Sequence, residues 1–211
     1  RLIYMKKIIY FMLVITLVLL SGCESSNHSN TNSSLEAESS QRDVRYAAVN
    51  VSYEVYNTAK ELVDVSKVVV SGKVTGFTFV AVNRNNYEIA TDETAQKDKE
   101  IFTIYTVEVT TPYKYVNDDV PEKLNLWIEG GFEDMFVEEQ LEALGGSGTI
   151  TIAFNRPEIE IGKTYLFSLL TENGVDMYVI NSDQSIISLD NLQNKDRLNL
   201  FTVQDIIDCF D

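Results

Sequence analysis

The chain has 211 residues, of which 32 are acidic and 17 basic, and its formal net charge is −15 at pH 7. This length is sufficient for one domain with a hydrophobic core. The acidic balance argues against a nucleic-acid binder, because phosphate backbones are bound by clustered lysine and arginine side chains. Two cysteines cannot form a disulfide-rich scaffold or a four-cysteine zinc site, and a single histidine excludes sites with several histidine ligands.

The first 22 residues have the organisation of a secretion signal. Lys6 and Lys7 follow Met5 and precede an apolar run from Ile8 to Leu20, which is shorter than the about 20 residues that a membrane-spanning helix needs. A short basic region followed by an apolar stretch of this length is typical of a cleaved signal peptide. We therefore expect residues 1–22 to be removed on export.

The segment Leu20-Ser21-Gly22-Cys23 at the end of this signal resembles the lipobox of bacterial lipoproteins. The resemblance implies that Cys23 is thioether-linked to diacylglycerol, with acyl chains such as palmitate, and becomes the first residue of the mature protein. Two acyl chains are sufficient for stable membrane anchoring. The alternative is an ordinary secretion signal followed by an incidental cysteine. We expect a lipid-anchored protein on the extracytoplasmic face of the cell membrane, and the composition favours a Gram-positive cell.

Residues 23–42 are rich in serine and asparagine and contain no aromatic residue. Such a segment cannot bury enough apolar surface to offset the entropy of ordering, so it is expected to be a flexible tether. His28 lies in it without neighbouring metal ligands, which favours a solvated histidine. Removal of residues 1–22 takes away three basic residues and no acidic ones, so the formal charge changes from −15 to −18. Anionic lipid headgroups repel such a charge, and the folded part should stand off the membrane.

The remaining residues, 43–211, have the pattern of one β-rich domain. Alternation of apolar and polar residues, with turn signals between the runs, predicts strands at 67–82, 101–111, 124–129, 149–154, 165–170 and 177–180, and a further candidate at 185–189. Residues expected to face the core are Tyr105, Val107, Val109, Leu124, Leu126, Ile128, Ile150, Ile152 and Phe154. In the first strand the apolar parity switches after Gly76, which indicates a bulge or bend.

Three short helices are predicted as well. Apolar residues at helical spacing, including Val55, Leu62 and Val63 in the first, indicate helices at 53–65, 133–144 and 203–210. Thr202 and Asp205 have the spacing of a capping box for the last helix. Cys209 lies near its end and is expected to be a buried or half-buried apolar residue.

These elements indicate a mainly β fold, because several short strands with regular turns are typical of a barrel or sandwich. Three segments, at 66–74, 105–109 and 162–167, occur in an order that resembles bacterial secreted domains related to the tissue-inhibitor-of-metalloproteinases and netrin-like barrel. That resemblance implies a small Greek-key, OB-like barrel. The animal inhibitors act through a disulfide-tied N-terminal cysteine. Cys23 is expected to carry lipid instead, so inhibition by that mechanism is not implied.

Aromatic residues provide the main indication of a binding site. Trp127 is placed on the polar face of its strand, Phe132 follows a Gly-Gly break, and Tyr113 and Tyr115 lie in the preceding loop. OB-type barrels bind ligands on one strand face and the adjoining loops. These four aromatics can therefore anchor a peptide, a glycan or a protein. The alternative is that a helix covers Trp127 in a second small core, which the usual burial of large aromatics favours.

Other chemistry has weaker support in the sequence. Glu133, Asp134 and Glu138 belong to an acidic run that can serve as a Ca²⁺ site, a glycosidase carboxylate pair or, as charge runs usually do, a solvated face. Cys209 has no histidine in the folded part that would activate its thiol. No phosphate-binding, dinucleotide-binding or EF-hand motif occurs in the sequence, so no cofactor is expected.

Three functional hypotheses follow from these patterns. The first is a non-enzymatic lipoprotein that presents a β-barrel to bind a protein or glycan outside the cytoplasmic membrane. The second is a structural or assembly accessory whose first or last helix docks onto a membrane complex. The third is an envelope glycan hydrolase that uses two carboxylates from the acidic residues, which requires a pair about 5–9 Å apart in a cleft.

Overall fold

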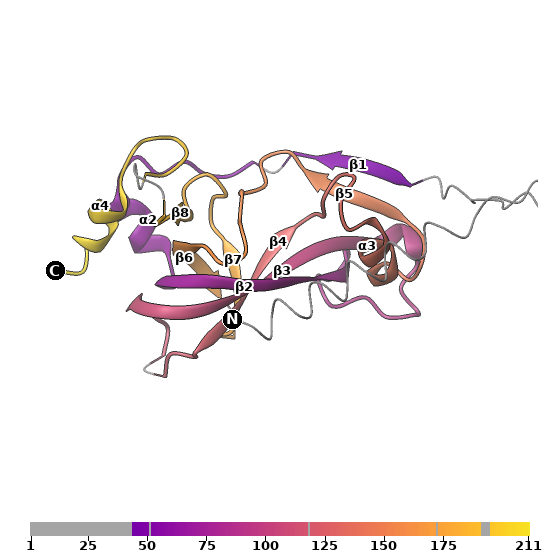
Figure 1. The fold of residues 1–211 in the computed structure, drawn as a ribbon, viewed down its shortest axis with the longest axis horizontal. Coiled ribbons are helices and arrows are strands. Elements are labelled where there is room, and N and C mark those ends of the chain that lie inside the picture. The colour runs from indigo at the N-terminus through magenta and orange to yellow at the C-terminus, as the bar shows by residue number, and fades with distance from the viewer. Residues whose placement is uncertain (1–43, 51, 118, 172, 191–194) are drawn as a thin grey trace, which may run out of the picture. The chain divides into compact units, whose positions relative to one another are not determined.

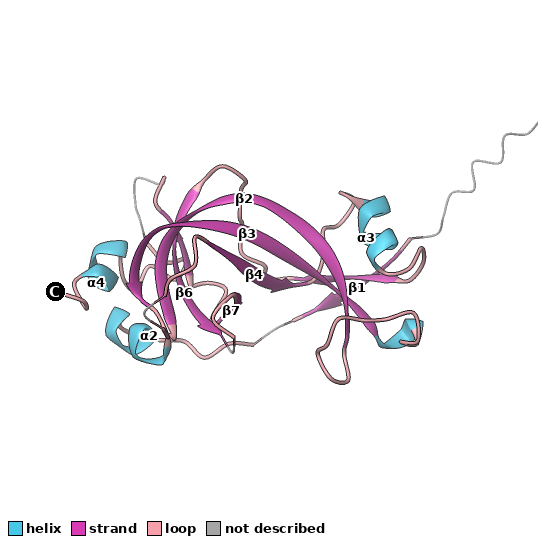
Figure 2. Cartoon of the chain, turned by 90° about the horizontal axis from the view of Figure 1, so that it is seen from below, coloured by secondary structure: helices cyan, strands magenta, loops and turns pink. Residues whose placement is uncertain are grey.

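A long hairpin of two antiparallel strands, β2 (Val68–Asn83) and β3 (Lys99–Lys114), is the largest feature of the fold. The computed structural model describes residues 44–211 except 51, 118, 172 and 191–194. The predicted signal peptide, Cys23 and the tether with His28 lie outside the described residues. Figure 2 shows both strands curving along their length. The polar segment between them contains the short helix η1 (Gln96–Asp98).

The hairpin belongs to a sheet of six strands. The other four are β4 (Lys123–Glu129), β6 (Thr164–Thr171), β7 (Asp176–Val179) and β8 (Ile186–Ser188). The strand order is β2-β3-β4-β7-β6-β8, and β6 pairs with β2 in addition, so the pairings return to the first strand. All these pairs are antiparallel except β4–β7. The mainly β class and the strands predicted here are confirmed.

The predicted irregularity near Gly76 is present as a bulge. Val74 lies opposite Val107 and Gly76 lies opposite Thr106, so Thr75 is an extra residue in β2. Because side chains alternate between the two faces of a strand, one extra residue moves all later side chains to the other face. Phe77 consequently packs partly buried against the same core as Val74.

The main hydrophobic core lies within this sheet. The inward placement of Leu124, Leu126 and Ile128 is confirmed, because the exposed fraction of each is at most 3%. Tyr105 and Val107 of β3 are also buried, whereas Val109 is partly buried. Other residues that complete this core include Val68, Val70, Phe167, Leu169 and Met177.

Two helices cover one end of the sheet, α2 (Ala59–Val65) and α4 (Val203–Ile207), which lie close together in Figures 1 and 2. They share a second core with Val69, Leu166 and Ile187 from the strands, and its helical members are Ala59, Leu62, Val63, Val203 and Ile206. The capping box at Thr202 and Asp205 is confirmed. Each helix is nevertheless shorter than predicted.

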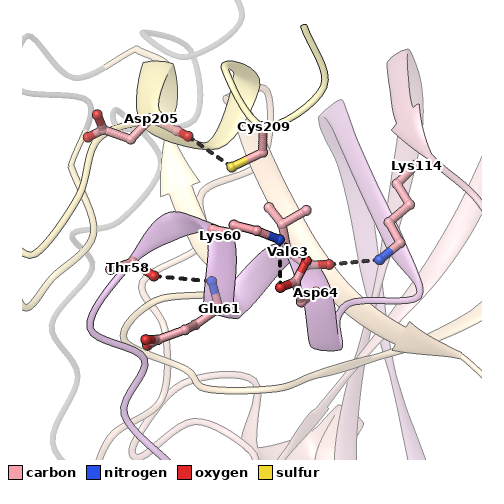
Figure 3. A network of polar contacts seen from close by, with 8 residues as sticks. All are labelled: Thr58, Lys60, Glu61, Val63, Asp64, Lys114, Asp205 and Cys209. Carbon is pink, nitrogen blue, oxygen red and sulfur yellow. Dashed lines mark hydrogen bonds and ion pairs between the residues drawn. The ribbon is translucent and has the colours of Figure 1, made fainter.

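The predicted helix at 53–65 was wrong over its first half. Thr58 has extended backbone and its side chain accepts a hydrogen bond from the Glu61 N–H at 3.2 Å, so the helix begins at Ala59. Val55, expected on the apolar stripe, is 51% exposed. Figure 3 shows the other end of this helix, where Lys114 Nζ of β3 donates to the Val63 carbonyl at 2.7 Å. This bond satisfies one of the carbonyls that a helix end leaves without a partner.

The third helix, α3 (Val137–Ala143), is also shorter than the predicted 133–144. Asp134 and Phe136 have φ angles of 56° and 53°, and this left-handed conformation cannot continue a right-handed helix. Leu141 and Leu144 are buried as expected, in a third cluster with Ala81, Ile101 and Ile150.

Two strands form a separate parallel pair, β1 (Arg45–Val49) and β5 (Thr149–Ala153). β1 was not predicted, because a parallel partner a hundred residues away leaves no local turn signal. The inward placement of Phe154 was wrong: its side chain is 76% exposed, since β5 ends at Ala153 and the chain then turns. Ile150 is buried and Ile152 is only partly buried.

The expected burial of Cys209 was also wrong. The residue follows the end of α4, which stops at Ile207, and its thiol is exposed. Its Sγ–H donates to the Asp205 carbonyl at 3.3 Å (Figure 3). The described residues belong to one compact unit that extends from Arg42 to Asp211. No helix within the described residues is long and apolar enough to cross a membrane.

Candidate ligand-binding groove

Trp127 lies on the outer face of the sheet, opposite the face that forms the main core. The alternation in β4 buries Leu124, Leu126 and Ile128, so Trp127 between them must point the other way. Trp127 is half-buried and belongs to none of the three core clusters. The expectation that a helix covers this side chain is therefore not met.

Three aromatic rings from three neighbouring strands meet on this face. In the strand register Trp127 lies directly opposite Tyr178 of β7, and Tyr178 in turn lies opposite Leu170 of β6. The Trp127 ring centroid is 6.3 Å from that of Tyr178 and 6.2 Å from that of Phe102 in β3. Such separations are typical of aromatic rings in contact.

These side chains form the floor of a groove of about 720 Å³, which we call the aromatic groove. Its floor consists of Phe102, Trp127, Tyr178 and Leu170, and the last two are 38% and 39% exposed. A groove of this volume is in the range of small-molecule and cofactor sites. The outer face of β3, β4, β7 and β6 is thus an apolar strip accessible to a ligand.

Asp176 holds Trp127 in place. Its Oδ1 accepts hydrogen bonds from Trp127 Nε1 and from Asn125 Nδ2, both at 3.0 Å, and its Oδ2 accepts one from Asn173 Nδ2 at 2.7 Å. Burial alone would raise the pKa of this carboxyl, but the three hydrogen bonds outweigh it and hold the pKa below its ordinary value. The indole N–H of Trp127 is therefore already bonded within the protein, and the side chain lines the groove.

The turn between β6 and β7 positions Asp176. Asn173 Oδ1 accepts from the backbone N–H groups of Val175 at 3.0 Å and Asp176 at 2.8 Å. The Tyr115 hydroxyl donates to the Gly174 carbonyl and ties this turn to the end of β3. Tyr115 therefore supports the groove through the turn, and it is not among the described groove-lining residues.

Asn86, Tyr87 and Glu88 of the loop between β2 and β3 line the groove next to the aromatic floor, and we call them the polar wall. Asn86 Nδ2 donates to Glu88 Oε2 at 2.7 Å, and Asn86 Oδ1 accepts from the Glu88 N–H at 3.2 Å. Between them Tyr87 adopts a φ of 58° and is 75% exposed. Lys67, Val82 and Thr171 complete the described lining. Hydrogen-bonding groups thus stand beside the aromatic faces.

A pair of carboxyl groups lies on the same face, next in register to the aromatic floor. Glu129 of β4 is opposite Phe102, and Glu100 of β3 is two residues from Phe102. Burial, the charge of Glu100 and a hydrogen bond with Glu100 raise the pKa of Glu129, and nearby Arg84 acts in the opposite direction. Tyr53 lies near this pair, and the pKa of its hydroxyl is raised by burial and then by Glu129 and Asp183.

The other predicted aromatic residues do not join Trp127. Phe132 packs with Phe77, Phe79 and Phe136 at ring separations of 5.4–5.9 Å. The Arg156 guanidinium lies 4.0 Å from its ring centroid and donates from Nη1 to the Gly130 and Gly131 carbonyls. Phe132 is thus a partly buried packing residue near the start of α3.

Tyr113 has a different position from the one predicted. It does not lie in a loop but is the second-last residue of β3, which continues to Lys114. Its ring stacks on that of Phe210 with 5.9 Å between centroids. It therefore packs against the second core, near α2 and α4. Of the four predicted binding residues, Trp127 alone is among the described residues that line the groove.

The acidic run is not assembled into a metal site in the part of the chain that the structure describes. No group of three or more His, Cys, Asp or Glu side chains there is arranged to hold an ion. Asp134 of the predicted cluster instead accepts from the Tyr46 hydroxyl of β1 at 3.3 Å. Glu138 lies in α3, which begins at Val137, whereas Glu133 precedes the helix and Asp134 has a left-handed backbone. The three acidic residues therefore do not share one helix face.

Sequence reasoning missed every described groove-lining residue except Trp127, and it missed Asp176 as well. The missed residues that contact Trp127 are Phe102, Tyr178 and Asp176. Phe102 could have been identified from the sequence. It lies an odd number of residues from the inward-facing Tyr105 and Val107, so the alternation of side chains places it on the outer face of the sheet. Tyr178 and Asp176 had none, because their proximity to Trp127 depends on the parallel pairing of β7 with β4. No protein-family model and no curated protein matches the sequence.

Proposed function

We propose that this chain is a membrane-anchored extracytoplasmic lipoprotein whose β domain is a binding module. The lipobox-like segment ending in Cys23 supports the anchor and its location. The aromatic groove supports the binding role, and the observation that carries it is the contact of Trp127 with Phe102 and Tyr178 across an open sheet face. Half-exposed aromatics held rigidly in a concave site are typical of ligand contact.

The domain fits a five-stranded OB-like barrel, which we propose as its fold. The ring of pairings runs β2-β3-β4-β7-β6 and returns to β2, with α3 inserted between β4 and β6. OB folds bind ligands on their second and third strands and on the loops after the first and fourth strands. Counted from β2, these are β3, β4, the β2–β3 loop and the β6–β7 turn. Residues from β3, β4 and the β2–β3 loop line the aromatic groove.

Binding is favoured over glycan hydrolysis by the geometry of the carboxyl groups on this face. The charge of Glu100 raises the pKa of Glu129, so these two carboxyl groups lie near each other, whereas the two carboxyl groups of a glycosidase stand about 5–9 Å apart to accommodate the reacting bond or a water molecule. Asp176 is committed to three hydrogen bonds beneath Trp127. The closeness of Glu100 to Glu129 and the hydrogen bonds of Asp176 therefore favour the binding proposal over an acid and base pair.

Crosslinking in intact cells tests the binding role. The native lipidated chain, a Trp127→Ala variant and a Phe154→Ala variant are compared, because Phe154 is an exposed aromatic outside the described groove lining. We expect a molecule that is captured by the native chain and the Phe154 variant and lost from the Trp127 variant. Equal capture by all three proteins would contradict binding in the aromatic groove and would favour docking through α2 and α4.

Membrane fractionation tests the anchor. We expect the native chain to be found in the membrane fraction. The Cys23→Ala variant cannot form the thioether, so we expect no mature form of it in the membrane fraction. Membrane retention of a processed Cys23→Ala chain would contradict lipid anchoring.

A further inference from the structure

The composition of the aromatic groove identifies the chemical class of its ligand. We propose that the groove binds a neutral oligosaccharide or polysaccharide strand, with sugar rings packed against Trp127 and Tyr178 and bordered by Phe102. This inference rests on the proposed binding function and deepens it.

The floor matches a ligand made of successive flat rings. Phe102, Trp127, Tyr178 and Leu170 come from four adjacent strands, and adjacent strands are about 4.8 Å apart, so the strip is roughly 14 Å long. It runs across the strands. The Trp127 and Tyr178 ring planes along it differ by 33°, and the Phe102 ring is edge-on to Trp127 at 61°. A pyranose ring has an apolar face of C–H groups and a hydroxyl-bearing edge, so a short run of linked sugars matches this strip.

The polar wall suits hydroxyl groups. Asn86 and Glu88 are linked by two hydrogen bonds, which fixes an amide and a carboxylate side by side next to the floor. Lys67 and Thr171 add an ammonium and a hydroxyl group to the lining. Together they provide donors and acceptors for the edge of a sugar ring whose face rests on an aromatic side chain.

The charge of the groove favours a neutral ligand. Among the described lining residues, Lys67 and Glu88 carry opposite charges, and the others are uncharged. The whole chain has a net charge of −15 and repels polyanions such as phosphate-linked polymers. A strongly basic peptide would need a cluster of free carboxylates in the groove, and Asp176 is already occupied by three donors.

The sheet backbone argues against a peptide strand as the ligand. Extended peptides gain affinity by adding to an open sheet edge through main-chain hydrogen bonds. Beneath the groove, β4 is paired with β3 on one side and β7 on the other. The floor therefore offers side-chain faces and no free edge, which suits ring stacking.

The single tryptophan of the chain makes this proposal directly measurable, because all tryptophan emission comes from Trp127. The full-length chain is titrated with tetramers of β-1,4-linked N-acetylglucosamine, glucose and mannose and with neutral glycan strands released from cell walls. We expect at least one of these probes to shift the emission to shorter wavelength with saturation and to protect Trp127 from iodide quenching.

Three variants locate the binding. Tyr178→Ala and Phe102→Ala should each weaken saccharide binding roughly tenfold or more, as expected for aromatic anchors. Phe154→Ala removes an exposed aromatic outside the described groove lining and should bind as the native chain does. Circular dichroism confirms that each variant is folded.

The outcomes separate this inference from the proposed function. If no neutral saccharide perturbs Trp127 while crosslinking captures a Trp127-dependent protein, the saccharide inference is overturned and the binding function is retained. If saccharides bind with equal affinity to native chain, Tyr178→Ala and Phe102→Ala, the groove assignment is overturned. If neither saccharides nor any crosslinked molecule depends on Trp127, both are overturned.

Discussion

Replacing Asp176 with asparagine removes the carboxylate that accepts hydrogen bonds from Asn125, Asn173 and Trp127. We expect a loss of about 1 kcal/mol in the free energy of unfolding. We also expect a more mobile Trp127 side chain and weaker binding of a ligand in the aromatic groove. Because the folded-state pKa lies below the ordinary value of 3.8, this contribution is fully present only well above that value and is lost as the pH falls through the lowered pKa. Urea denaturation at pH 3 and pH 7 measures it. An equal effect from Asp92→Asn, an exposed site, would contradict it.

Glu129 has the opposite dependence on pH. Burial and the neighbouring Glu100 raise its pKa above the ordinary value of 4.5, so the folded state binds its proton more tightly than the unfolded state does. Stability from this group is therefore present at low pH and decreases as the pH rises through the raised pKa. We expect Glu129→Gln to be more stable than the native chain at pH 7 and similar at pH 4. Equal pH dependence of unfolding in both proteins would contradict this assignment.

At the scale of elements, the β2–β3 hairpin depends on a close approach of its strands at Gly72. A Cβ atom there would lie 2.5 Å from Val107 Cγ1 and 3.0 Å from the Glu108 carbonyl oxygen. We expect Gly72→Ala to lower the free energy of unfolding by about 1–3 kcal/mol, as overpacking does. The matched control is Gly76→Ala, where nothing lies within 4 Å. Equal losses for the two variants in thermal unfolding would show that crowding is not the cause.

The terminal helix α4 depends on its capping box. The Thr202 Oγ1 accepts from the Asp205 N–H at 3.2 Å, and Asp205 Oδ2 accepts from the Thr202 N–H at 2.7 Å. Thr202→Ala should cost about 1 kcal/mol, whereas Thr202→Ser keeps the acceptor and should cost less. Because α4 packs with α2 over Val69, Leu166 and Ile187, the loss should appear in global unfolding. A serine variant as unstable as the alanine variant would contradict the cap.

At the scale of the whole molecule, excess negative charge opposes folding. The chain has 32 acidic and 17 basic residues, and like charges repel one another more strongly in the compact state. Added salt screens this repulsion, so the melting temperature should rise as sodium chloride is increased from low concentration to about 0.15 M, where the Debye length is about 8 Å. A melting temperature that falls over this range would show that attractive ion pairs dominate.

The sequence alone was sufficient for features that depend on local pattern. Alternation in β4 placed Leu124, Leu126 and Ile128 inside and Trp127 outside, and the parity switch at Gly76 indicated the bulge, because side-chain direction follows directly from strand geometry. Phe154, Val55 and Cys209 were misplaced because each lies at or beyond the end of an element, where the periodicity no longer applies.

Tertiary structure alone decided which distant residues meet. The sequence indicated Trp127 as a candidate, but the parallel pairing of β4 with β7 brings Tyr178 and Asp176 beside it, and packing near α3 removes Phe132 from the same face. The pairing of β1 with β5 likewise joins segments a hundred residues apart. Local periodicity determines the face on which a side chain lies, whereas strand partners are chosen by burial summed over the whole domain. The outward position of Trp127 is therefore predictable from the sequence, whereas the groove is a property of the fold.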